Sequence, residues 1–190
     1  MLKSYHRLPT MLTTWTVARK IPFEDPQILY YVRIGYVAVQ VLVMSIYFYI
    51  SMTIKAKNDK TVLKYVDAAN PMTQEPGQLV NTTVRDYDLG EVSKLLRAVY
   101  TGVAMMAFLH GYMKFTQPLF VQAIMGLKGV FEATPFKIHV LGQKAEGDLK
   151  RPWKGAGGMF GAAAGGPQTD SAAIAEAEKR VAGVSNKKDD

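Results

Sequence analysis

An uncharged apolar stretch from Ile34 to Ile54 constrains this chain more than any other feature. As an α-helix, its 21 residues extend about 31 Å, close to the roughly 30 Å hydrocarbon core of a bilayer. Tyrosines lie near both of its ends, as in the aromatic belts of membrane proteins. Lys55 and Lys57 follow it and can extend their ammonium groups to the interface. The pattern predicts a membrane-spanning helix over about residues 28–54.

Two further apolar stretches follow later in the chain. Ala98 to Met113 contains no Lys, Arg, Asp or Glu, and flanking cations that can reach the interface make a second span over about residues 95–114 credible. Phe115 to Leu127 is uncharged for only 13 residues. That length favours a re-entrant or short spanning segment, placed at residues 115–131.

The polar loop 55–94 between the first two spans has its own pattern. Thr61–Val66 and Leu79–Val84 are rich in β-branched residues and are separated by turn residues. They predict a small β-hairpin outside the membrane.

Two acidic residues are placed to begin helices. Asp25 precedes Pro26, which suits an N-cap followed by proline at the first helical position. Asp88 is expected to cap a second helix that begins near Leu89.

The fold class expected is a mainly α, polytopic helical membrane protein with two to three membrane segments, a small extramembrane β-containing part and a flexible basic tail. The expected divisions are an amphipathic or frayed helix (1–20), a membrane domain (21–133), a basic tail segment (134–154), and a Gly/Ala linker with a short helix (155–190). Within the last two, alternation predicts one strand at Phe136–Leu141 and a helix at Asp170–Val181 closed by Gly183.

The net charge of +7 indicates an anionic partner, either acidic lipid headgroups or nucleic acid such as ribosomal RNA. It is also what the cytosolic loops of any membrane protein carry. If the third segment crosses or returns through the membrane, the loop 55–94 and the tail share the cytosolic side. If it does not cross, loop and tail lie on opposite sides; if the N-terminal segment also spans, the loop is lumenal and the tail stays cytosolic.

No catalytic constellation is present in the sequence. The chain has no cysteine, which excludes disulfides, thiolate metal sites and a cysteine nucleophile. Its three histidines lie at no metal-ligand spacing from a second histidine or carboxylate. We therefore expect a protein that is not an enzyme and that needs no cofactor or metal.

Polar residues at membrane depth are the more telling feature, because burying them in lipid is costly unless they face a partner or a water-filled cavity. Some share a helix face, since they lie four or seven residues apart. Together they predict a hydrophilic intramembrane groove that receives the polar flank of a client helix. Its candidate residues are Arg33, Gln40, His110, Lys114, Gln117 and Gln122. The alternative is that the cations extend to the interface and that His110 bonds a neighbouring helix.

Basic residues outside the spans form a second candidate site. The stretch Gly147–Lys154 mixes cations with a tryptophan expected to be exposed, which suits phosphate contacts and base stacking. A basic segment lying on acidic lipid fits equally well. The candidate ribosome or lipid contacts are Lys55, Lys57, Lys150, Arg151, Trp153 and Lys154.

A series of motifs between about Ile21 and Glu178 resembles the fungal inorganic phosphate transport protein family. It includes Ile21–Pro26, Tyr31–Arg33, Ala56–Asp59, Leu63–Val66, Thr82–Leu89, Tyr100–Gly102, Ala104–Met106, His110–Phe120, Lys137–His139 and Gly147–Pro152. Members of this family are also described as the membrane component of the SRP-independent (SND) targeting route at the endoplasmic reticulum.

The resemblance implies a multi-pass endoplasmic reticulum protein with a cytosolic tail that targets or inserts membrane proteins. The partners it implies are the Sec translocon, the ribosome with its RNA, client transmembrane segments, the bilayer and other SND components. A subunit or dedicated chaperone of phosphate transport is the alternative.

Overall fold

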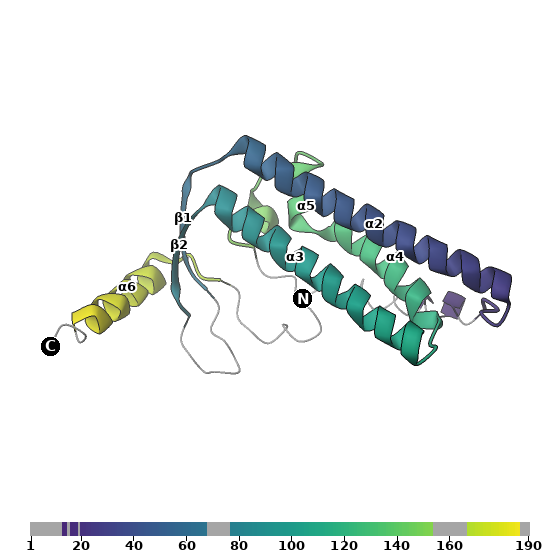
Figure 1. Ribbon diagram of the computed structural model, residues 1–190. Helices are drawn as coiled ribbons and strands as arrows, with labels where there is room; N and C mark the ends of the chain where they lie inside the picture. The colour runs from purple at the N-terminus through teal and green to yellow at the C-terminus, as the bar shows by residue number, and fades with distance from the viewer. Residues whose placement is uncertain (1–12, 15, 19, 68–76, 154–166, 187–190) are drawn as a thin grey trace. The chain divides into compact units, whose positions relative to one another are not determined.

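The computed structural model describes residues 13–14, 16–18, 20–67, 77–153 and 167–186 (Figure 1). These residues are mainly helical, as predicted, with one two-stranded sheet. The chain divides into two compact units. The first contains Met1–Met52 and Glu91–Lys137, and the second contains Thr53–Gly90 and Ile138–Asp190. The second unit thus groups the polar loop with the tail segment, although they are far apart in sequence.

Helix α2 (Pro26–Lys57) begins where the sequence predicts. The backbone N–H of Gln27 donates to Asp25 Oδ1 at 2.8 Å, so Asp25 is the N-cap and Pro26 opens the helix. Lys55 and Lys57 occupy its last turn, where their charge complements the helix dipole.

Helix α3 (Val84–Met106) begins earlier than predicted, and Asp88 is not its cap. Thr83 takes that position: its Oγ1 accepts a hydrogen bond from the backbone N–H of Asp86 at 3.2 Å and donates to Asp86 Oδ2 at 2.9 Å. The Thr83 hydroxyl thus satisfies one orphan backbone donor of the first turn, as an N-cap side chain does. Asp88 therefore lies inside the helix, where its side chain is free for another role.

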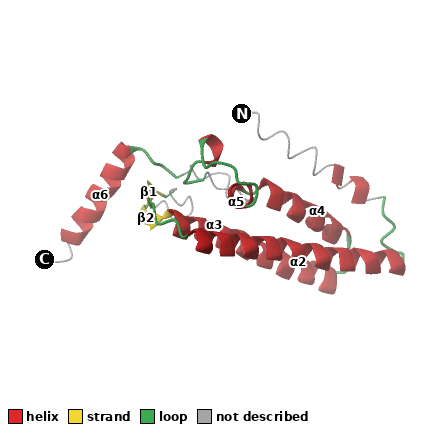
Figure 2. Ribbon diagram, turned by 90° about the horizontal axis from the view of Figure 1, so that it is seen from above, coloured by secondary structure: helices red, strands yellow, loops and turns green. Residues whose placement is uncertain are grey.

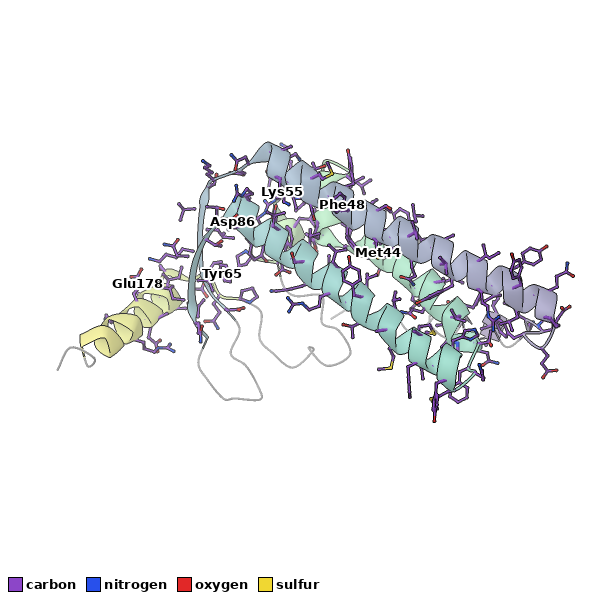
Figure 3. All side chains as sticks on the ribbon, in the orientation of Figure 1. Met44, Phe48, Lys55, Tyr65, Asp86 and Glu178 are labelled. Atoms are coloured by element: carbon purple, nitrogen blue, oxygen red, sulfur yellow. The ribbon has the colours of Figure 1, made fainter. Side chains whose placement is uncertain are left out.

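Two helical stretches are long and apolar enough to cross a membrane, Pro26–Lys57 and Val84–Tyr112, with mean hydropathies of 1.9 and 1.4. The second joins α3 to a π-helical segment, η2 (Ala107–Tyr112). Only 28% and 11% of their apolar windows are buried inside the protein. Phe48, labelled on α2 in Figure 3, is 64% exposed. Such exposed apolar surface is what lipid covers, so the two helices are candidate membrane spans.

The third apolar segment forms one helix, α4 (Gln117–Glu132), of 16 residues. In the first unit it lies beside α2 and α3 (Figures 1 and 2), where Tyr36, Met106 and Leu119 form a shared core. A helix of this length extends about 24 Å, shorter than a full span. Whether it enters the membrane stays a prediction.

The strand predicted at Phe136–Leu141 is wrong, because Thr134–His139 forms a short helix, α5. The backbone N–H of Lys137 donates to the Ala133 carbonyl at 3.2 Å, which places the start of this helix directly after α4. A six-residue alternation is too short to separate a strand from a helical turn by periodicity.

The predicted hairpin is confirmed by strands β1 (Val62–Val66) and β2 (Leu79–Thr83), which pair antiparallel with Val62 opposite Thr83. The connection between the two strands lies partly outside the described residues. Before β1, Asp59 Oδ1 accepts hydrogen bonds from the Thr61 hydroxyl at 2.6 Å and the Thr61 amide at 3.0 Å. These bonds stabilise the carboxylate and hold the pKa of Asp59 below its usual value.

The tail returns to this hairpin. Val66 and Gln168 exchange two backbone hydrogen bonds of 2.9 Å, and Lys64 forms a salt bridge with Glu178 on helix α6 (Ser171–Asn186). The predicted helix is present, but it continues past Gly183 to Asn186 instead of closing there. The predicted Gly/Ala linker, residues 155–166, lies outside the described residues.

Candidate functional site

A polar pair joins α2 to η2 in the first unit. Arg33 Nε donates to His110 Nε2 at 2.9 Å, and His110 Nδ1 lies 3.2 Å from the carbonyl oxygen of Phe115. A carbonyl can only accept, so Nδ1 carries the ring proton and Nε2 is the bare acceptor for arginine. His110 in this arrangement is neutral, so it does not compensate the positive charge of Arg33.

The π-helical geometry of η2 positions this histidine. Met113 N–H donates to the Phe108 carbonyl at 3.3 Å, five residues back, and Phe115 N–H reaches Leu109 at 3.0 Å. Lys114 then adopts φ = 61°, a left-handed conformation that is uncommon for a non-glycine residue. Single-turn π segments concentrate at functional sites, because the widened turn redirects side chains. Here the turn directs His110 toward α2.

A second polar contact lies between α2 and α4. Tyr36 Oη and Gln122 Oε1 are 3.3 Å apart, and Gln40 on the same helix as Tyr36 is only 7% exposed. Gly102 on α3 makes room for this contact, because a Cβ there would lie 2.6 Å from Gln122 Nε2. Sequence reasoning named Gln40 and Gln122 but not Tyr36, whose phenol is the group that reaches the glutamine.

The remaining two groove candidates lie elsewhere in the first unit. Lys114 and Gln117 line a cavity of about 510 Å³ together with Phe23, Glu24 and Thr116. The structure thus brings Arg33 to His110 and Tyr36 to Gln122, and places Lys114 beside Gln117. A single continuous groove through all six residues stays a prediction.

The space at Gly102 gives a testable expectation. Gly102→Ala gains about 1 kcal/mol of helix propensity but must displace the Gln122 amide, which costs a hydrogen bond of similar size. At Gly90, also on α3, an added Cβ meets no atom within 4 Å. We expect Gly90→Ala to raise the thermal unfolding midpoint in detergent and Gly102→Ala to leave it nearly unchanged. Equal stabilisation by both would show that the Gln122 contact contributes nothing.

An ionic cluster is buried in the second unit. Arg151 donates to Asp88 through Nε to Oδ1 and through Nη2 to Oδ2, both at 2.6 Å, and His139 Nε2 lies 2.8 Å from Asp88 Oδ2. The side chains of Asp88, His139 and Arg151 are 1%, 5% and 14% exposed. A bidentate pair of this kind is among the stronger charge-assisted contacts. It ties helix α3 to the tail segment.

The protonation of His139 follows from its surroundings. A carboxylate only accepts, so Nε2 must carry a proton. Nδ1 is buried and has no hydrogen-bond partner in the part of the chain that the structure describes. The His139 ring is therefore held by Asp88 at Nε2, whereas its buried Nδ1 lacks a hydrogen-bond partner among the described residues.

Three aromatic rings pack beside the ionic cluster. Tyr87 is in edge contact with Tyr65 and Trp153, at centroid distances of 5.7 and 5.3 Å, and Figure 3 labels Tyr65 on β1. The Trp153 backbone N–H donates to Tyr87 Oη at 2.6 Å, and its indole donates to the Leu149 carbonyl at 3.0 Å. The expectation of an exposed Trp153 is wrong, since it is 5% exposed. It completes a core and cannot stack on a base in this conformation.

The other basic candidates differ in exposure. Lys55, Lys57 and Lys150 are exposed, Arg151 is engaged by Asp88, and Lys154 lies outside the described residues. Among the described residues, no group of three or more His, Asp or Glu side chains is arranged to hold a metal. Contact of the exposed lysines with RNA or lipid stays a prediction.

The Asp88 cluster was missed because its members are 51 and 63 residues apart. A signal was present: Asp88, His139 and Arg151 each lie in one of the motifs that carry the family resemblance. Grouping the charged residues of those motifs would have indicated a shared site.

Comparison with known proteins confirms that resemblance. The family model described as Phosphate transport (Pho88) matches residues 1–185. SRP-independent targeting protein 3 of Saccharomyces cerevisiae is 44% identical over 169 residues, covering 89% of this chain and 90% of that protein. A Schizosaccharomyces pombe protein named as a homolog of it is 37% identical over 163 residues, covering 85% and 84%. No solved structure matches the chain significantly.

Proposed function

Because this chain belongs to the Phosphate transport (Pho88) family, we propose that it shares the role named in its relatives, SRP-independent targeting, and that it also inserts membrane proteins. The proposed location is the endoplasmic reticulum membrane. The proposed role is non-enzymatic and uses no cofactor.

The observation that carries this proposal is the Arg33–His110 pair on two helices long enough to span a membrane. A polar segment crossing lipid loses its hydrogen bonds to water and costs several kcal/mol. The Arg33 guanidinium, held in place by the neutral imidazole of His110, offers its remaining N–H donors at the depth where that cost arises. In this mechanism a client helix enters beside α2 while its polar flank exchanges water for these groups.

The proposed orientation places the tail and its lysines in the cytosol, following the positive-inside rule. Exposed Lys55, Lys57 and Lys150 then face the ribosome, whose RNA offers phosphates, or acidic headgroups. The Sec translocon and other SND components are proposed as neighbours at the same site. Client transmembrane segments are the substrate.

Arg33→Gln tests the polar pair directly. In membranes that contain only the variant, insertion of a client with a charged translocated flank should fall about tenfold, equivalent to roughly 1.4 kcal/mol, measured by protease protection. A client with an apolar flank should be inserted as before, because it does not need the donors.

Arg97→Gln is the matched control, since Arg97 borders the uncharged stretch Ala98–Met113 but forms no hydrogen bond with His110. It should leave both clients unaffected. Equal insertion by the Arg33 and Arg97 variants would remove the polar pair from the mechanism.

A second candidate function, a subunit or dedicated chaperone of phosphate transport, is favoured by the description of the family. Purified protein in liposomes should then take up phosphate, or its loss should lower one transporter without affecting general client insertion. Liposomes that take up no phosphate, together with a broad insertion defect when the protein is lost, would remove this alternative.

A further inference from the structure

A narrow apolar groove lies between α2 and α4 in the first unit, where the two helices run side by side (Figures 1 and 2). Its lining extends from Ile28 to Val39 on α2 and from Phe120 to Leu127 on α4. The polar pair of Arg33 and His110 is not part of this lining. The groove is thus a feature that the proposed insertion mechanism leaves unexplained.

The length and the lining of the groove suit an alkyl chain. The α2 lining covers eleven residue steps, about 16 Å at 1.5 Å per residue, and the groove volume is about 490 Å³. The residues that line the groove are almost wholly apolar. An extended acyl chain can lie along it with carbon contacts near 4 Å.

Two opposite charges lie one turn beyond this groove. On α4, Gln117 and Phe120 are three residues apart and share a face, so the cavity lined by Gln117 adjoins the start of the groove. That cavity contains Glu24 and Lys114. Neither side chain forms a hydrogen bond or ion pair with the described part of the chain. A cation and an anion left unpaired beside an apolar groove complement a zwitterionic headgroup.

We propose that this site binds one zwitterionic phospholipid, with an acyl chain between α2 and α4, its phosphate at Lys114 and its amine at Glu24. The lipid would fill the space beside Tyr36 and hold α4 against α2. This inference requires that the groove lies in a bilayer, but it does not require the targeting role.

The test uses the full chain in nanodiscs of dioleoyl phosphatidylcholine that contain a photoactivatable acyl-chain analogue. Cross-links mapped by mass spectrometry should concentrate on peptides holding Phe120 and Ile124. Gly35→Trp fills the groove from its α2 wall, where an added Cβ meets no atom within 4 Å, and should reduce these cross-links at least about tenfold. Gly129→Trp, on the opposite face of α4 and equally open, should leave them unchanged.

Lys114→Gln keeps the groove intact and should lower the same cross-links about tenfold through loss of the phosphate contact. Cross-links spread evenly over exposed residues such as Phe48, and indifferent to both Gly35→Trp and Lys114→Gln, would overturn the proposal in favour of bulk lipid. A nascent client helix that cross-links inside the groove and displaces the lipid analogue would also overturn it. Insertion measured on the same variants keeps this outcome separate from that of the Arg33 experiment.

Discussion

Asp88→Asn is expected to destabilise the second unit by about 3–5 kcal/mol, because it leaves the Arg151 guanidinium with no carboxylate in a nearly buried site. The substitution preserves the size of the side chain, so the effect is electrostatic and not a packing defect. The acid receives two hydrogen bonds of 2.6 Å from Arg151 and contacts His139, and its own exposure is 1%. Removing it affects both partners together.

Trp153 fluorescence reports the loss. The chain has two tryptophans, and a Trp15→Phe background leaves Trp153 as the single probe. Urea unfolding in detergent should show a lower midpoint for Asp88→Asn, with emission shifted toward that of exposed tryptophan.

Asp86→Asn is the matched control, two residues away on α3, because the Asp86 side chain is 49% exposed. It should lower the urea midpoint much less than Asp88→Asn, because it only weakens the first turn of α3. A similar loss of stability for both variants would show that the buried ionic cluster does not stabilise the second unit. In a double variant, Arg151→Met should recover part of the Asp88→Asn loss, since it removes the unpaired charge.

Trp153→Ala is expected to cost about 3–5 kcal/mol, the usual range for removing a large aromatic side chain from a core. The ring is 5% exposed and contacts Tyr87, and the Arg151 guanidinium lies 5.5 Å from its centroid. Its loss leaves a cavity beside the ionic cluster. Limited proteolysis should then cut between Ile138 and Trp153 at lower protease concentration than in the parent protein.

Trp153→Phe separates packing from hydrogen bonding. It keeps an aromatic ring against Tyr87 but loses the indole donor to Leu149, so it should cost only about 1 kcal/mol. If Trp153→Ala were as mild as this, the residue would be a surface contact and the exposed, RNA-facing interpretation would return.

The long apolar pattern and the local turn chemistry were sufficient to predict part of the fold. The uncharged run from Ile34, the Asp25–Pro26 start of α2 and the paired β-branched segments act through neighbours a few residues apart. Helical periodicity, capping and strand propensity depend on such short separations, so they can be read in order along the chain.

The role of Asp88 could not be predicted from its sequence neighbours. Sequence alone assigned it to a helix start, because an aspartate before an apolar run is a common cap. Thr83 and Asp86 satisfy the first turn instead, which leaves Asp88 for Arg151, 63 residues later. The choice between the two cap candidates could not be made from sequence, because the contact of Asp88 with Arg151 joins residues that are distant along the chain.

The two candidate spans, the hairpin and the unusual polar residues among apolar ones can all be predicted along the chain. Which polar residues meet depends on the fold: His110 with Arg33, Gln122 with Tyr36, and Arg151 with Asp88. The fold also turned Trp153 from an expected surface aromatic into a core residue. The reason is physical: hydrophobic and helical preferences are summed over local windows, whereas a buried polar contact requires two groups within about 3 Å, and chain folding alone fixes that distance.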